Sequence, residues 1–147
     1  MWSSTLTAYL HYLGFMVAFA ALVVEHQLFS SDLPLKQAWR LVITDSLYGL
    51  AAVTVLTTGV LRVMYFGQGP DYYLHNPVFH AKVGLFIAVG VLSLYPTISV
   101  LTWIPGLRKG EPPTLTSAQG QRFLWVVRGE LLGLALIPLL AAMLARG

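Results

Sequence analysis

Four long apolar stretches dominate this chain of 147 residues and leave room for little else. A helix that crosses a bilayer needs about 20 mostly apolar residues, and its backbone polar groups must be satisfied within the segment. Because the connections are short, successive helices must run antiparallel. The sequence therefore predicts an all-α fold, an antiparallel four-transmembrane-helix bundle forming one membrane domain over residues 1–147, with helices at about 4–28, 37–66, 78–104 and 119–145.

The composition supports an integral membrane protein and excludes several kinds of chemistry. Hydrophobic residues make up 56% of the chain and charged residues 10%, against about 25% charged residues in a soluble domain. The absence of cysteine excludes disulfides, thiolate catalysis, cysteine-ligated iron–sulfur clusters and covalently attached haem. The net charge of +3 comes from scattered Lys and Arg residues, so the expected partner is the lipid bilayer and no nucleic acid.

The distribution of cations predicts an orientation. Cytoplasmic loops carry an excess of Lys and Arg. The first and third connections, with the adjoining helix ends, hold five such residues, and the opposite side holds three: Lys36, Arg40, Arg108, Lys109 and Arg122 against Arg62, Lys82 and Arg146. We therefore expect a multi-pass protein of a bacterial inner (plasma) membrane, with both termini outside.

Ionisable residues within the apolar stretches are the candidate functional groups, because such residues are costly in a membrane and usually face a bundle interior. Sorted by depth, they predict an outer cluster, an inner cluster and two residues near the middle of the fourth helix. The outer set is His11, Arg62, His75, His80 and Lys82, the inner set is Glu25, His26, Arg40, Asp45 and Arg122, and the middle pair is Arg128 and Glu130.

Helical spacing predicts which faces point inward. Residues three and four positions apart share a stripe of a helix. The first helix gives His11, Gly14, Ala18, Ala21 and Glu25; the second gives Asp45, Tyr48, Ala52, Val55, Gly59 and Arg62; the third gives Lys82, Phe86, Gly90, Ser93 and Thr97. In the fourth helix, Gly129 and Gly133 form a pair of small residues suited to close packing. The four tryptophans, Trp2, Trp39, Trp103 and Trp125, fall near helix boundaries and are expected at the interface.

The outer cluster predicts a haem b site. A neutral imidazole ligates haem iron axially, and His11 and His80 have similar predicted depth on different helices. Arg62 and Lys82 are the candidate catalytic residues, since either could pair with haem propionates or an acidic substrate. Other interpretations stay open: His11 could bond a neighbouring helix, Arg62 and Lys82 could extend to the headgroups, and His75 could replace His80 as the second ligand.

Two segments resemble the HemJ-type protoporphyrinogen oxidases, which are small bacterial membrane proteins with haem b. They are residues 9–15 (YLHYLGF) and residues 79–83 (FHAKV). The resemblance implies that His11 and Lys82 are important for activity, and that the reaction is the oxidation of protoporphyrinogen IX to protoporphyrin IX.

Other segments resemble a family of predicted bacterial membrane proteins of unknown function, and this second resemblance covers most of the chain. They are residues 47–51 (LYGLA), 59–62 (GVLR), 73–77 (YLHNP) and 79–82 (FHAK).

The leading functional hypothesis is a haem b or porphyrin-binding inner-membrane protein with a redox role, resembling a protoporphyrinogen oxidase. Its expected partners are a porphyrin or quinone-like small molecule and a further copy of the chain. One alternative is a small proton-coupled transporter or channel that uses a relay of Glu25, Asp45, Arg128 and Glu130. Another is a non-catalytic membrane protein whose polar residues pair between helices.

Overall fold

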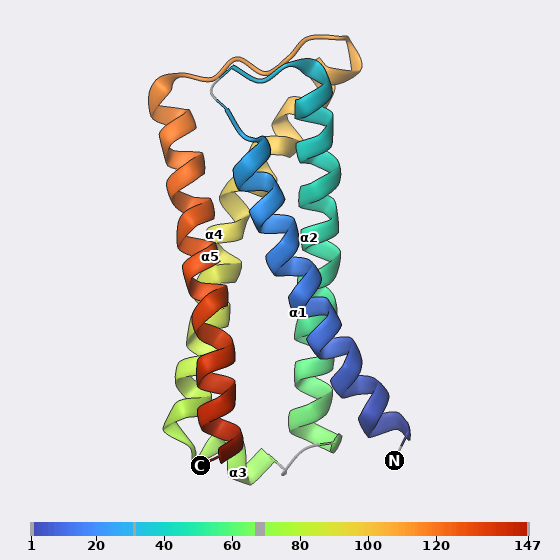
Figure 1. Ribbon diagram of the computed structural model, residues 1–147, viewed down its shortest axis with the longest axis vertical. Coiled ribbons are helices and arrows are strands. Elements are labelled where there is room, and N and C mark those ends of the chain that lie inside the picture. The colour runs from blue at the N-terminus through green and yellow to red at the C-terminus, as the bar shows by residue number, and fades with distance from the viewer. Residues whose placement is uncertain (1, 31, 67–69, 147) are drawn as a thin grey trace.

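Four long helices form an antiparallel bundle in the computed structural model, which describes residues 2–30, 32–66 and 70–146 (Figure 1). The predicted all-α fold is confirmed. Both chain termini and a short helix lie at one end of the bundle, which we call the terminal end, and the connections after the first and third long helices lie at the opposite loop end. In chain order the elements are α1 (Trp2–Leu28), α2 (Leu35–Leu61), the π-helix η1 (Arg62–Phe66), α3 (Pro70–Leu74), α4 (Pro77–Arg108) and α5 (Ser117–Arg146).

By length and composition, all four long helices could cross a membrane, and α2 continues through η1 as one such segment. Large apolar side chains are exposed along their outer faces, for example Leu50 at 68% and Ile43 at 66%. An apolar outer surface of this kind suits contact with lipid chains.

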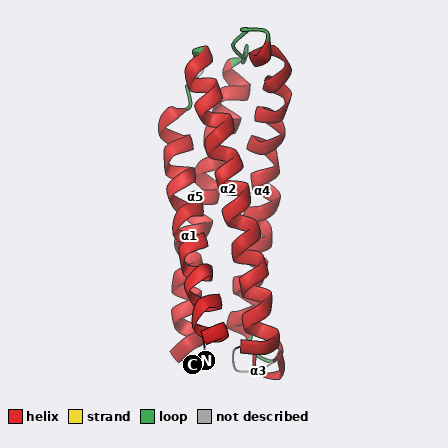
Figure 2. Cartoon of the chain, turned by 90° about the vertical axis from the view of Figure 1, so that its right-hand side faces the viewer, coloured by secondary structure: helices red, strands yellow, loops and turns green. Residues whose placement is uncertain are grey.

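The helices follow one another around the bundle in the order α1, α2, α4, α5, so that α1 also contacts α5. The closest partners are α1 with α2 and α4 with α5. Figure 2 shows the helices aligned along the long axis, whereas Figure 1 shows that α1 and α5 separate toward the terminal end. The bundle is therefore two tight hairpins joined side by side.

Small residues allow the close approach within each hairpin. A Cβ added at Gly133 would collide with Val89, and one at Gly14 would lie 3.2 Å from Val55 Cγ2. Gly129 faces Leu92 in the same way, so the predicted small-residue pair of α5 does pack against α4.

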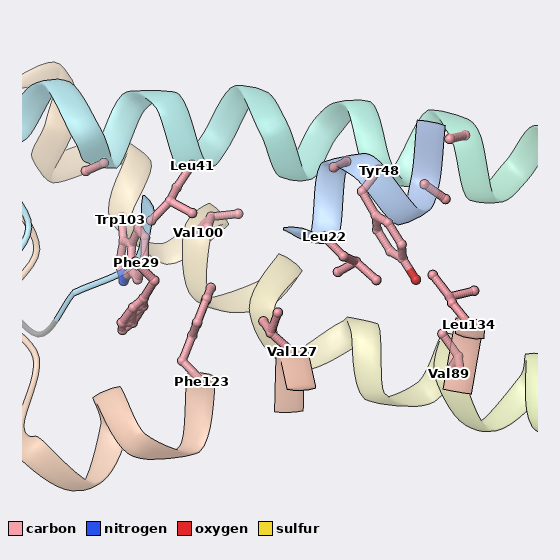
Figure 3. Close-up of a cluster of buried hydrophobic side chains, with 14 of the residues drawn as sticks. Leu22, Phe29, Leu41, Tyr48, Val89, Val100, Trp103, Phe123, Val127 and Leu134 are labelled. Atoms are coloured by element: carbon pink, nitrogen blue, oxygen red, sulfur yellow. The ribbon is translucent and has the colours of Figure 1, made fainter. Parts of the chain in front are cut away.

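The buried core has an aromatic part and an aliphatic part (Figure 3). Toward the loop end, Phe123 packs between Phe29 and Trp103, with ring centroids 4.3 Å and 6.0 Å apart. Trp103 lies near the end of α4, as predicted, but it does not anchor the outer surface of the bundle, because this side chain is only 9% exposed and belongs to the core. Farther along, Leu22, Tyr48 and Leu134 fill the space between the helices.

Capping groups account for several helix bounds. Asn76 caps α4 by accepting a hydrogen bond from Val78 N (2.9 Å), and Pro77 occupies the first turn. Thr116 and Gln119 exchange side-chain to backbone bonds, a capping box that starts α5 at Ser117, two residues before the predicted position. The residues of this capping box begin within the segment that the sequence predicts as a loop, so the helix starts earlier than its apolar pattern indicates.

The first two helices each begin two residues before the predicted positions, at Trp2 and Leu35, and three further features were not predicted. The α4 helix passes Pro105 and ends at Arg108, after which Gly110 adopts a positive φ of 78°. The last turns of the second span widen into η1. The predicted second loop contains the short helix α3, which begins with Pro70 and carries Asp71 in its first turn.

The inward faces are predicted well for α1 and less well for α4. Gly14, Ala18, Ala21 and Glu25 are all buried in α1 as expected. In α4 the predicted stripe does face inward, since Thr97 bonds Asp45 of α2 and Phe86 packs against the core. The prediction missed the buried positions Val89, Pro96 and Val100, which lie beside that stripe, and Gly90 is exposed.

Candidate functional site

A cavity of about 650 Å³ lies at the terminal end of the bundle, and we call it the terminal cavity. It is lined by residues of every helical element from α1 to α5, η1 included. His11, Arg62 and Lys82 all line it, together with apolar side chains such as Phe15 and Ile137. Its size falls within the range of about 300–1,000 Å³ typical of small-molecule sites.

His11 is held in one tautomer by α2. Its Nδ1 lies 2.9 Å from the Thr58 hydroxyl oxygen. That hydroxyl donates its own proton to the Thr54 carbonyl (2.7 Å), so it can only accept from the histidine. A neutral imidazole in this position carries its proton on Nδ1, which leaves the lone pair on Nε2. Gly59 makes room for the ring, because a Cβ there would lie 3.4 Å from His11 Cε1.

Two cations stand beside this histidine. Arg62 is placed at the junction of α2 and η1, with its guanidinium carbon 5.4 Å from the centre of the Tyr12 ring. Lys82 comes from the first turns of α4 and is half-buried. Among the described residues that line the terminal cavity none is acidic, so this charge is available to an anionic ligand.

The other two candidate histidines lie elsewhere. His80 is exposed, and its Nε2 is hydrogen-bonded to the Leu74 carbonyl (2.7 Å). His75 is also exposed, and its Nδ1 bonds the Asp71 carbonyl (2.8 Å). Neither lines the terminal cavity. The structure thus brings together His11, Arg62 and Lys82 from the predicted site, while His80 and His75 fasten the ends of α3.

A second polar group lies in the bundle interior, and we call it the carboxyl cluster. It consists of Glu25 from α1, Asp45 from α2 and Glu130 from α5, with exposures of 0%, 5% and 0%. Asp45 interacts electrostatically with both glutamates and accepts a hydrogen bond from Thr97 of α4 (2.8 Å). Glu130 thus joins the predicted inner cluster.

Arg128 does not accompany Glu130. Two residues in a helix are separated by about 200°, which points these side chains in opposite directions. Arg128 is exposed, donates from Nε to His26 Nε2 (3.1 Å), and stacks over the Trp125 ring at 5.2 Å. Arg128 is therefore separated from the three carboxyls of the predicted relay, Glu25, Asp45 and Glu130.

Three polar residues of these sites were not expected from the sequence to have their observed partners: Thr58, Tyr48 and Thr97. Each contacts another helix, so its partner depends on how two helices are rotated and staggered. The weak signal for Thr58 was its spacing of three residues from Val55, which places the hydroxyl on the predicted inward side of α2. Within the described ranges, no group of three or more His, Asp or Glu residues is arranged to hold a metal ion.

Comparison with known proteins gives a family and no characterised relative. The family model described as "Predicted membrane protein (DUF2214)" matches residues 3–147. No match was found among curated proteins or among solved structures. The match covers nearly the whole chain, and the four candidate spans agree with its description. This multi-pass membrane protein therefore belongs to the DUF2214 family of predicted membrane proteins.

Proposed function

We propose that this protein binds haem b, or a closely related porphyrin, in the terminal cavity. The observation that carries the proposal is the convergence of one neutral histidine and two cations on an apolar cavity of about 650 Å³. A porphyrin that bears two carboxylates needs an apolar slot for the ring, positive charge for the carboxylates and, when iron is present, an axial ligand.

His11 is the proposed axial ligand. The bond to Thr58 occupies Nδ1–H and leaves Nε2 with its lone pair, which is the arrangement found for most metal-bound histidines. No second histidine lines the described part of the cavity, so the proposed iron has one histidine ligand. Haem, when bound, supplies one-electron redox chemistry.

Arg62 and Lys82 are the proposed partners of the propionates. Hydrogen bonds to charged groups contribute about 1.5–3 kcal/mol each, which makes both cations measurable contributors to affinity. The redox role and the oxidation of protoporphyrinogen, which the resemblance to HemJ-type enzymes implies, remain predictions that accompany this proposal.

An absorbance spectrum of the purified protein tests the proposal. Protein from haem-replete cells, or protein mixed with hemin, should show a Soret band. His11→Ala should lose this band, whereas His80→Ala, which alters an exposed histidine outside the cavity, should keep it.

The cations are tested against a matched control. Arg62→Gln and Lys82→Gln should each weaken hemin binding by about tenfold or more. Arg122→Gln removes an exposed cation of α5 near the loop end and should leave binding unchanged. The absence of a Soret band in the wild-type protein, before and after addition of hemin, would refute the proposal.

A further inference from the structure

The carboxyl cluster has the features of a site that binds a small positive charge, independent of the proposed porphyrin. Glu25 and Glu130 are fully buried on two different helices, and Asp45 from a third helix interacts with both. The fully buried side chains one turn earlier, Leu22 and Val127, show that the same helix faces are apolar there. The glutamates therefore lie in the dry interior and not in a polar channel.

Both glutamates lack the hydrogen bonds that an ionised carboxylate requires. All four of their side-chain oxygens are buried without a hydrogen-bond partner among the described residues. The effective cost of burying an unpaired ion is several kcal/mol. Arg128, the cation nearest to Glu130 in sequence, is exposed and bonds His26, so it does not offset that cost.

The positive charge that balances these buried carboxylates must come from a bound ligand. The arrangement of the side chains favours protons over a metal ion as that ligand. The described His, Asp and Glu side chains do not form a group spaced to coordinate a metal. Two carboxyls can, however, hydrogen-bond each other when one of them carries a proton, and Asp45 lies within hydrogen-bonding reach of Glu25.

We propose that Glu25, Asp45 and Glu130 form an internal proton-binding site that exchanges protons with the terminal cavity through Tyr48. Tyr48 is buried, and its hydroxyl interacts with the Ser93 hydroxyl and electrostatically with all three carboxyls. The side chain points inward between the helices (Figure 3).

A small cavity of about 40 Å³ lies beside Tyr48. Tyr48 and Ser93 line it, and Phe15 lines both this cavity and the terminal cavity. A water molecule needs about 10–15 Å³ of this kind of volume, so one water fits beside the two hydroxyls. In the proposed step, a proton arriving from the terminal cavity is added to this water, which passes it to the Tyr48 oxygen as the Tyr48 hydroxyl gives its own proton to a Glu130 carboxylate oxygen. The water and the tyrosine end unchanged, and Glu130 ends protonated. One proton moves inward, and no electron is transferred.

Titratable groups of three helices face this site. Glu25 comes from α1, Asp45 and Tyr48 come from α2, and Glu130 comes from α5. From α4, the hydroxyls of Ser93 and Thr97 contact this group. Any proton taken up by the cluster is therefore shared among these carboxyls.

Infrared spectra of the full-length protein in lipid, recorded near neutral pH in H2O and then D2O, test the site. The wild-type protein should show the C=O band of a protonated carboxyl, and this band should shift in D2O. Glu130→Gln and Glu25→Gln should each lose or shift the band, and Glu111→Gln, at an exposed loop position, should leave it unchanged.

The path is tested by the rate of the shift. Tyr48→Phe should slow the exchange into D2O by about tenfold or more, because it removes the relay hydroxyl. Tyr95→Phe is the matched control, since Tyr95 is a half-buried tyrosine of α4 that does not line the small cavity.

Three results would overturn the proposal. One is a wild-type spectrum without a protonated carboxyl band, which is read even if the variants do not fold. Another is a band that neither glutamine variant changes. The third is thermal stabilisation of the wild-type protein by Na⁺ or Ca²⁺ with no protonated carboxyl, which would make the occupant a metal ion. These results are independent of the Soret band, so failure here is distinguishable from failure of the porphyrin proposal.

Discussion

Replacing Thr58 by valine should weaken porphyrin binding without changing His11, the proposed ligand of the iron. Thr58 is 5% exposed, and its hydroxyl is the acceptor that holds the Nδ1–H of His11. Valine has nearly the same shape, so the packing of α1 against α2 is retained. The histidine donor then loses its partner, and a buried donor left unpaired costs about 1–3 kcal/mol.

The free histidine can relieve this cost by turning or by moving its proton, whereas a histidine bound to iron through Nε2 cannot, so the cost lowers the affinity. At 1.4 kcal/mol per factor of ten, it corresponds to about a 5- to 140-fold weaker Kd for hemin. Removal of the groups that orient metal-bound histidines typically weakens affinity about 10- to 100-fold. Titration of hemin into detergent-solubilised protein, followed at the Soret band, measures the change. Thr57→Val makes the same substitution on an exposed position of α2 and should bind like the wild type.

One outcome would refute the reasoning about the tautomer. If Thr58→Val binds hemin as tightly as the wild type while His11→Ala does not bind it, the hydrogen bond does not orient the ligand. If both variants bind normally, the histidine is not a ligand at all.

Two further changes test the packing around the sites. Gly133→Ala should destabilise the protein by about 1–3 kcal/mol, because the new methyl group collides with Val89, and a lower melting temperature in detergent would show it. An unchanged melting temperature would mean that α4 and α5 are farther apart than described. Tyr72→Phe removes a 2.9 Å bond from the tyrosine hydroxyl to the Leu144 carbonyl. Hydrogen exchange should then become faster at the end of α5, whereas equal protection in both proteins would count against this contact.

The fold could be predicted from the sequence because it follows from hydropathy and length, which act locally. Four apolar stretches leave a chain in lipid few alternatives to helices, and the stripe of Gly14, Ala18 and Ala21 predicts the buried face of α1. In α4 the polar residues of the predicted stripe, Ser93 and Thr97, do contact α2. The side of α4 that packs on α5 was not predicted, because it depends on Val89 fitting against Gly133, which is a contact between two segments.

The residues of the candidate sites also divide into those that depth along a helix predicts and those whose partners depend on contacts between segments. His11, Arg62 and Lys82 were predicted to gather because all three have similar depth, and they line one cavity. His80 has that depth too, but the α3 helix in the preceding connection provides a carbonyl that bonds its ring. Depth alone cannot predict such a turn. The partnership of Glu130 with Asp45 also depends on rotation, which separates it from Arg128.

The divergence of α1 and α5 at the terminal end has a consequence for how the cavity is filled (Figure 1). Met16 of α1 and Pro138 of α5 both line the cavity and are exposed on the outer surface. The cavity therefore borders a surface that lipid would cover, and an amphipathic ligand that passes between these two helices would come from the bilayer. Occupancy would then follow the mole ratio of ligand to lipid or detergent, and a dissociation constant measured in micelles would change with the amount of detergent.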